Sequence, residues 1–299
     1  MPRFAANVTM LFTEVPMLAR PDLAREAGFD GVEVLFPYDH PAKDWQAALA
    51  GMPLALINTH PGDWAAGDRG HAAVPGMEET FRASFLRAAD LAARLGAGRL
   101  HVMAGVAKGE QAEATYRENL AWAAAQAPDL TLTIEPLNPD DMPGYFLNDF
   151  DQAARIVDDL ALPQLGIQFD LWHAARIHGD PDAVWARHKA RVNHIQIAGF
   201  PSRNEPGGGG FDLTGLCAEL DSGDYTGFVS AEYLPARATV HGLMWLAALK
   251  GRARLIVDVD TLPAPVPAEA AASMPGHSIP PSPHPATHLL PTATAASSQ

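Results

Sequence analysis

The sequence has very little cysteine and no long hydrophobic run. Its 299 residues include a single cysteine, Cys217, which excludes an internal disulfide framework. Cys217 falls in a segment of helical character, Leu213–Leu220, where ordinary packing is expected rather than a catalytic thiol. The N-terminus lacks the apolar core of a signal peptide, and no stretch reaches the roughly 18 apolar residues that a membrane span requires. These absences predict a soluble, cytoplasmic protein.

Basic residues are also scarce. The chain carries 21 lysines and arginines against 35 aspartates and glutamates, for a formal net charge of −14 and a pI near 5.2. A nucleic acid or an anionic membrane needs clustered Lys and Arg to neutralise its phosphates, so neither is expected as a partner. A small anionic substrate fits this charge if local cations hold it. A homo-oligomer is also compatible with the sequence.

Eight apolar runs of strand length alternate with segments of helical character. One of these segments, Met77–Leu95, repeats Phe and Ala at helical spacing, with charged residues elsewhere. Strand alternating with helix eight times predicts a (β/α)8 barrel, the TIM barrel, which typically needs about 250 residues. The predicted strands are Phe4–Met10, Gly31–Phe36, Leu54–Asn58, Arg99–Met103, Leu130–Leu137, Leu165–Leu171, Val192–Ala198 and Gly227–Tyr233.

Composition divides the chain into two parts. Residues 1–255 are expected to form the barrel, and residues 256–299 a disordered tail. From Thr261 onward the chain holds nine of its 26 prolines and is rich in Ala, Ser and Thr. Such a segment cannot bury enough apolar surface to offset the entropy lost on ordering.

Four of the predicted strands end in side chains that offer an oxygen ligand: Glu135, Asp170, Gln196 and Glu232. Parallel barrels place their chemistry at the carboxyl ends of their strands, so these side chains are expected to converge there. Three carboxylates and an amide form a hard donor set that suits Mg²⁺ or Mn²⁺ better than zinc or copper. Taken singly, each could cap a helix or face solvent. Gln196, however, lies between two isoleucines, and an amide inside a closed barrel must be hydrogen-bonded or coordinated.

Two further side chains adjoin this set. His173 lies one turn beyond Asp170, where it could hydrogen-bond a substrate oxygen or cap a helix. Arg203 follows the seventh run and could hold a substrate carboxylate through two hydrogen bonds. The alternative for Arg203 is a surface salt bridge with Glu205. The glycines at Gly207–Gly210 are not followed by Lys and Ser or Thr, so a lid or irregular loop explains them better than a phosphate cradle.

Several short motifs are spread over roughly residues 4–250. They include Phe4-Ala5-Ala6-Asn7, Gly31-Val32-Glu33, Phe36-Pro37-Tyr38, Gly62-Asp63-Trp64-Ala65-Ala66-Gly67-Asp68-Arg69-Gly70, Ile134-Glu135-Pro136-Leu137-Asn138, Gln168-Phe169-Asp170, His194-Ile195-Gln196-Ile197-Ala198, Arg203-Asn204-Glu205-Pro206-Gly207 and Glu232-Tyr233. On these motifs the chain resembles the hydroxypyruvate isomerase family, within the xylose-isomerase-like TIM barrels. The stretch that begins at Gly62 is specific for this subgroup. The chain after about Gly251 has no counterpart in the family.

The resemblance implies a divalent metal ion on Glu135, Asp170, Gln196 and Glu232. It implies that Glu135 and Glu232 also transfer protons, whereas related epimerases usually carry histidine in place of the glutamine. Substrate contacts are expected from Asn7, Glu33, Asn58, Trp64, His173, Arg203 and Glu205. Relatives commonly continue the Glu-Pro-Gly loop into a further glutamate where this chain has Gly210-Phe211, which leaves the substrate preference open.

The expected reaction is the aldose–ketose isomerisation of a small hydroxy-oxo acid, most concretely hydroxypyruvate to 2-hydroxy-3-oxopropanoate (tartronate semialdehyde). A divalent ion would stabilise the enediolate that forms when a proton α to the carbonyl leaves. Isomerisation of a 2-oxo-tetronate or epimerisation of a ketose would use the same site. A metal-dependent DNA endonuclease is disfavoured by the negative charge. A non-catalytic sugar-acid binding protein is disfavoured because a binder needs no acid–base pair.

Overall fold

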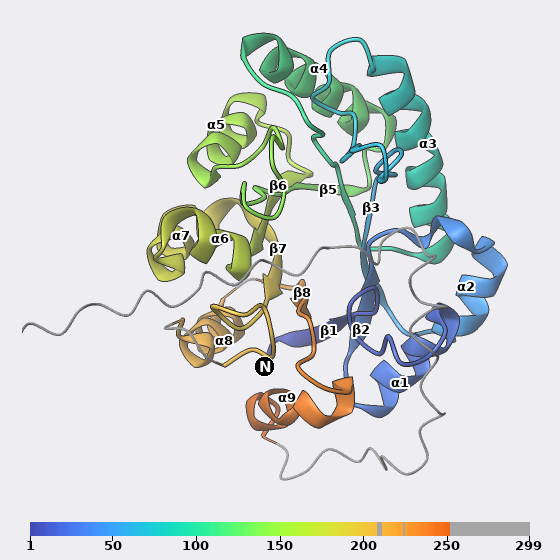
Figure 1. Cartoon of the computed structure of the whole chain (residues 1–299), viewed down its shortest axis with the longest axis vertical. Helices are drawn as coiled ribbons and strands as arrows, with labels where there is room; N and C mark the ends of the chain where they lie inside the picture. The colour runs from blue at the N-terminus through green and yellow to red at the C-terminus, as the bar shows by residue number, and fades with distance from the viewer. Residues whose placement is uncertain (208–210, 224, 252–299) are drawn as a thin grey trace, which may run out of the picture.

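The computed structural model describes residues 1–207, 211–223 and 225–251 (Figure 1). Within these ranges, eight parallel strands close into one barrel in chain order, and helices surround it. The predicted (β/α)8 fold is confirmed. The strands are β1 (Arg3–Asn7), β2 (Gly31–Val34), β3 (Leu54–Asn58), β4 (Arg99–His101), β5 (Thr131–Ile134), β6 (Leu165–Asp170), β7 (Val192–Ile197) and β8 (Phe228–Ala231).

The helices form the outer ring of the barrel. None of those described is long and apolar enough to cross a membrane. The α-helices are α1 (Arg20–Glu26), α2 (Ala42–Leu49), α3 (Glu78–Leu95), α4 (Glu110–Gln126), α5 (Phe150–Leu160), α6 (Leu171–His178), α7 (Pro181–His188), α8 (Leu213–Ser222) and α9 (Met244–Leu249). Short 3-10 helices are η1 (Met17–Ala19), η2 (Pro37–Asp39), η3 (Lys189–Arg191) and η4 (Thr239–Gly242).

Helix α3 shows how the apolar pattern builds this ring. Phe81, Phe85, Ala88 and Ala92 repeat at three- and four-residue spacing and are buried, while the other face of the helix is charged. The helix ends at Gly96, whose φ of +66° lies in the left-handed region that favours glycine. The predicted helix over Met77–Leu95 is therefore confirmed to within one residue.

Alternation along the strands separates an apolar outer face from a polar interior. On β7, Ile195 and Ile197 belong to the main core, whereas the buried His194 and Gln196 at the alternate positions take part in polar contacts. The His194 ring reaches across the barrel to Glu33 on β2, at 2.8 Å from Nε2 to Oε2. The main hydrophobic core therefore lies between strands and helices, and the barrel interior is left for polar chemistry.

Several strands end earlier than the apolar runs predicted. Strand β1 stops at Asn7 because the Asn7 side chain accepts a hydrogen bond from the Thr9 backbone N at 3.0 Å, which turns the chain. Strands β5 and β8 end one residue before Glu135 and Glu232. The predicted tail, the domain boundary at residue 255 and the glycines at 208–210 lie outside the described residues.

Candidate active site

Four neighbouring strands deliver the predicted ligands to one end of the barrel. Asp170 is the last residue of β6, and Gln196 is its partner in the β6–β7 register. Glu135 and Glu232 directly follow β5 and β8. All four side chains are buried. Because parallel strands point the same way, their carboxyl ends form a single mouth, and these side chains line it.

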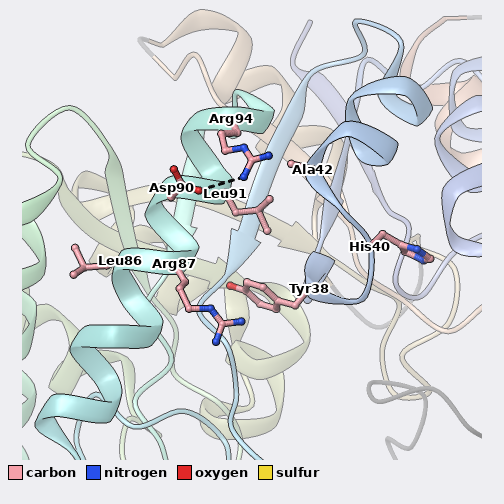
Figure 2. A pocket seen from close by; sticks show the side chains of 8 residues that line it. All are labelled: Tyr38, His40, Ala42, Leu86, Arg87, Asp90, Leu91 and Arg94. Atoms are coloured by element: carbon pink, nitrogen blue, oxygen red, sulfur yellow. Dashed lines mark ion pairs between the residues drawn. The ribbon is translucent and has the colours of Figure 1, made fainter.

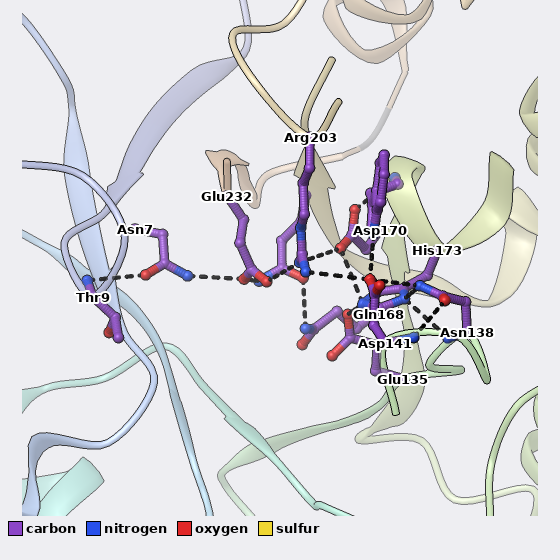
Figure 3. A network of polar contacts seen from close by, with 12 residues as sticks. Asn7, Thr9, Glu135, Asn138, Asp141, Gln168, Asp170, His173, Arg203 and Glu232 are labelled. Atoms are coloured by element: carbon purple, nitrogen blue, oxygen red, sulfur yellow. Dashed lines mark hydrogen bonds and ion pairs between the residues drawn. The ribbon is translucent and has the colours of Figure 1, made fainter. Parts of the chain in front are cut away.

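A buried guanidinium connects two of the carboxylates (Figure 3). Arg203 Nη2 lies 2.7 Å from Glu232 Oε1 and 3.3 Å from Asp170 Oδ2. Its Nη1 lies 3.9 Å from Asp141 Oδ2. The surface salt bridge with Glu205, which the sequence left open, does not form. Arg203 instead neutralises charge inside the site.

His173 is oriented by the loop that follows β5. Its Nδ1 accepts a hydrogen bond from the Asn138 backbone N at 3.0 Å, so the proton of the neutral ring is on Nε2. That nitrogen faces Asp170 Oδ2 at 3.6 Å and Glu135 Oε1 at 3.9 Å. Burial holds the pKa of His173 well below its usual value. A neutral His173 can therefore donate a hydrogen bond into the site.

Asp170 also has a structural role at the start of α6. It is the N-cap of α6, and its Oδ1 accepts a hydrogen bond from the Trp172 backbone N at 2.8 Å. The helix-cap explanation that the sequence offered for Asp170 is correct, and it is compatible with a ligand role because Oδ2 faces His173 and Arg203 instead.

Asn7 and Glu33 tie the site to the first two strands. Asn7 Nδ2 donates to both Glu33 Oε1 and Glu232 Oε2, at 2.8 Å each. Glu33 Oε1 also accepts from Gln196 Nε2 at 2.7 Å. These two residues therefore hold Gln196 and Glu232 in place.

The remaining predicted contact residues lie around the mouth. Asn58 ends β3, and its buried Oδ1 has no hydrogen-bond partner among the described residues. Trp64 packs at the rim between Phe36, at 6.0 Å between ring centroids, and the Arg69 guanidinium, at 3.6 Å from its ring centre. Trp64 lines a small pocket of about 50 Å³. Glu205 is not brought to the carboxylates: its Oε1 accepts from the Ala236 backbone N at 3.1 Å.

Burial dominates the electrostatics of the site. It raises the pKa of Asp170 and of Glu232 to about 8 each, although the Arg203 guanidinium lowers both. Burial raises the pKa of Glu135 well above its usual value, and Glu232 and Asp170 add to that shift. The pKa of Glu33 is raised by burial as well. The ionised site thus carries more buried negative charge than one guanidinium can offset, which favours a bound cation.

The donor set fits a hard divalent ion. Carboxylate oxygens of Glu135 and Asp170 lie within 4.8 Å of each other and of a ring nitrogen of His173, and Glu135 Oε1 is buried without a hydrogen-bond partner among the described residues. Gln196 is the exception in its orientation. Its Oε1 accepts from Gln168 Nε2 at 2.7 Å, and its Nε2 faces the carboxylates, so the amide must rotate before its oxygen can bind a metal.

A further layer of polar residues, which was not predicted from the sequence, lies deeper in the barrel than the predicted ligands. Gln168 and His194 each precede a predicted ligand by two positions and contact Gln196 and Glu33, respectively. His101 Nδ1 lies 3.6 Å from Glu135 Oε2. Gln168 and His194 could have been predicted from polar residues at every second position of β6 and β7, because residues two apart share one face of a strand.

A larger pocket of about 470 Å³ lies on the outer surface between α2 and α3 (Figure 2). Its single ion pair joins Asp90 Oδ2 and Arg94 Nη1 at 3.6 Å. Its walls contain none of the clustered carboxylates of the mouth. The lining residues are Tyr38, His40, Ala42, Leu86, Arg87, Asp90, Leu91 and Arg94.

Known proteins resemble this chain over nearly all its described length. Residues 21–249 match the family described as xylose isomerase-like TIM barrel. A 2-oxo-tetronate isomerase from Cupriavidus necator is 44% identical over 260 residues, 84% of this chain and 100% of that protein. A hydroxypyruvate isomerase from Escherichia coli is 39% identical over 252 residues, 82% of this chain and 98% of that protein.

Solved structures agree with this assignment. A Brucella melitensis protein described as an AP endonuclease of family 2 superposes with a TM-score of 0.79 at 40% identity, over 83% of this chain and 99% of that one. An L-ribulose 3-epimerase, with a TM-score of 0.62 at 18% identity over 86% of this chain and 88% of that one, shares the fold. The chain belongs to the xylose isomerase-like TIM barrel family. Its nearer likeness to hydroxypyruvate and 2-oxo-tetronate isomerases confirms the resemblance found in its motifs.

Proposed function

We propose that this protein is a metal-dependent isomerase that interconverts the aldose and ketose forms of a small hydroxy-oxo acid. The observation that carries the proposal is the convergence of Glu135, Asp170 and Glu232, all buried at the strand ends with raised pKa values. Buried carboxylates with pKa values near the working pH are suited to moving protons and to holding a cation. Curated relatives that are isomerases of small acids support the same conclusion.

The two glutamates are the proposed proton carriers. Glu135 Oε1 has no hydrogen-bond partner within the part of the chain that the structure describes, which leaves it free to take a proton. Glu232 is held from the opposite side of the site by Asn7 and Arg203. With hydroxypyruvate, one glutamate removes a proton from C3 and the other adds one at C2, while His173 Nε2 donates to a substrate oxygen. A bound Mg²⁺ or Mn²⁺, held by Glu135, Asp170, Gln196 and Glu232, would supply Lewis-acid stabilisation of the enediolate.

Hydroxypyruvate is the substrate we propose, and 2-oxo-tetronate is the second candidate. Both are small 2-oxo acids whose carboxylate a guanidinium such as that of Arg203 can bind. The relative that is 44% identical and described as a 2-oxo-tetronate isomerase favours the second candidate. The two substrates differ by one carbon, so the choice depends on the pocket walls around Asn58 and Trp64.

Two other classes of function fit the site less well. A multi-zinc DNA endonuclease needs a histidine-rich cluster and a basic groove. Among the described residues, the cluster able to hold a metal contains a single histidine, His173, and the chain carries a net charge of −14. A non-catalytic binder would not need buried carboxylates poised to exchange protons.

A substrate screen tests the proposal. Purified protein is stripped with a chelator, verified to be metal-free, and assayed with hydroxypyruvate, a 2-oxo-tetronate and D-fructose, with and without added Mn²⁺ or Mg²⁺. We expect turnover of a small 2-oxo acid that disappears on stripping and returns with the metal. Solvent deuterium should enter the product at the carbon that receives the proton. Full turnover by the verified metal-free protein would refute the metal dependence, and turnover of the free ketose alone would refute the acid substrate.

A further inference from the structure

We propose that Arg203 is an exchangeable counter-ion. Its guanidinium, which binds Asp170 and Glu232, competes with a metal ion for these carboxylates, and metal binding releases it to hold the carboxylate of the substrate. The inference rests on the function proposed above and assigns Arg203 two alternating partners. It explains why a residue expected to bind substrate is found on the predicted metal ligands.

The contacts of Arg203 favour exchange over a permanent structural pair. One nitrogen, Nη2, serves both carboxylates, and its distance to Asp170 is long at 3.3 Å. The guanidinium is buried, yet its Nε has no hydrogen-bond partner among the described residues. A guanidinium has five N–H donors in a planar fork and binds carboxylates best through two parallel bonds. Donors are therefore left over for an incoming carboxylate.

The backbone at Arg203 indicates that its inward position is imposed by the fold. Arg203 has a φ of +53°, in the left-handed region that a non-glycine residue rarely adopts. Hydrogen bonds from the Leu234 N to the Arg203 O and from the Gly199 N to the Asn204 O, both 2.7 Å, hold the loop in this form. Such strain persists where the surrounding structure directs a side chain to a task.

Charge decides how metal and guanidinium interact. Both are cations, and both require oxygen atoms of Asp170 and Glu232. A guanidinium that stays in place next to a divalent ion is repelled, so the two compete for these carboxylates. Removing the guanidinium should therefore tighten metal binding. If Arg203 instead arranged the carboxylates for the metal, removing it would weaken metal binding, so the direction of the change separates the two explanations.

The test measures Mn²⁺ affinity by equilibrium dialysis at pH 8. We compare wild type, Arg203→Gln, Arg203→Lys and a matched control, Arg176→Gln. Arg176 contacts the same indole, Trp172, at 5.6 Å against 5.9 Å for Arg203, but it pairs with Asp140 instead of the site carboxylates. Arg203→Gln should bind Mn²⁺ on the order of tenfold more tightly. Arg203→Lys keeps the charge and should stay close to wild type. Arg176→Gln, which removes a partly exposed charge, should change affinity by less than about twofold.

Substrate kinetics provide the second readout. At saturating Mn²⁺, Arg203→Gln should raise the KM for the 2-oxo acid much more than it lowers kcat, because substrate binding is lost while the proton carriers remain. Arg203→Lys should raise KM as well, because an ammonium cannot form the paired hydrogen bonds of a guanidinium. A KM unchanged in both variants would overturn the second half of the inference.

Each outcome of the binding test is informative. No Mn²⁺ binding by the wild type would defeat the proposed function itself. Binding by the wild type, with equal or weaker binding by Arg203→Gln, would overturn the exchange and leave the function standing. If Arg203→Gln is unfolded without metal, the exchange predicts that Mn²⁺ restores its circular dichroism, because the ion replaces the lost counter-charge. A variant that stays unfolded at saturating Mn²⁺ would refute the inference.

Discussion

Glu135→Gln separates the chemistry of this site from its stability. No described residue hydrogen-bonds Glu135 Oε1, and Oε2 lies 3.6 Å from His101 Nδ1. Burial raises the pKa of Glu135 well above its usual value, which favours the protonated, uncharged form of this carboxyl. Glutamine is then a close copy in shape and charge. The free energy of unfolding should change by at most about 1 to 2 kcal/mol, the cost of one buried amide hydrogen without an acceptor.

The same exchange at Glu232 should cost more stability. Glu232 accepts hydrogen bonds from Asn7 and Gln196 at Oε2 and from Arg203 at Oε1, so both oxygens of its carboxylate face donors. A glutamine there must turn its own NH₂ group toward one of these donors. The loss of a charged hydrogen bond of this kind is typically about 1.5 to 3 kcal/mol. The two variants should therefore differ in melting temperature while both lose activity.

Turnover of Glu135→Gln should fall by roughly two to four orders of magnitude, the usual contribution of a positioned acid or base, which corresponds to about 3 to 5 kcal/mol of barrier. The assay measures kcat at saturating Mn²⁺ and substrate, with bound metal verified. Glu219→Gln is the control, because Glu219 lies in α8 and bonds Lys189 and Trp185 away from the mouth. Near-normal turnover of metal-saturated Glu135→Gln would show that the proton carriers lie elsewhere.

Three further outcomes are expected. Asp170→Asn should weaken Mn²⁺ binding, measured by calorimetry, because it removes a charge. The fold, followed by circular dichroism, should change little. Unchanged Mn²⁺ affinity would exclude Asp170 as a ligand. Between about pH 7 and 8.5 the chelated protein should lose stability as the pH rises, because Asp170 and Glu232, with pKa values of about 8, hold protons that the unfolded chain has released. Above pH 7 the histidines of the unfolded chain are mostly neutral, as the buried histidines of the folded protein are, so they offset only a small part of this loss. A melting temperature that rises with pH would contradict the assignment. Truncation near Thr261 should leave melting temperature and turnover almost unchanged. The Cupriavidus necator relative aligns over its full length to only 84% of this chain, so a complete relative does without the remainder. A large loss of stability on truncation would show that the removed segment packs against the barrel.

Much of this protein could be predicted from its sequence alone. Eight apolar runs separated by helical patterns indicate a parallel barrel, because strand and helix periods are local properties of the chain. The position of an oxygen ligand after each of four runs then places Glu135, Asp170, Gln196 and Glu232 at one mouth, because parallel strands share a carboxyl end. The buried alternation on β7 was likewise visible from Gln196 between two isoleucines.

Other features were decided only by the tertiary structure. The pairing of Arg203 with Asp170 and Glu232, the rotation of the Gln196 amide toward Gln168 and the separation of Glu205 from the carboxylates depend on distances between residues far apart in the chain. The pKa values of the site carboxylates are raised by burial, which is a property of the closed barrel. Local sequence patterns determine which residues arrive at the mouth of this barrel, whereas the contacts and the dielectric environment inside it determine their charge and their partners.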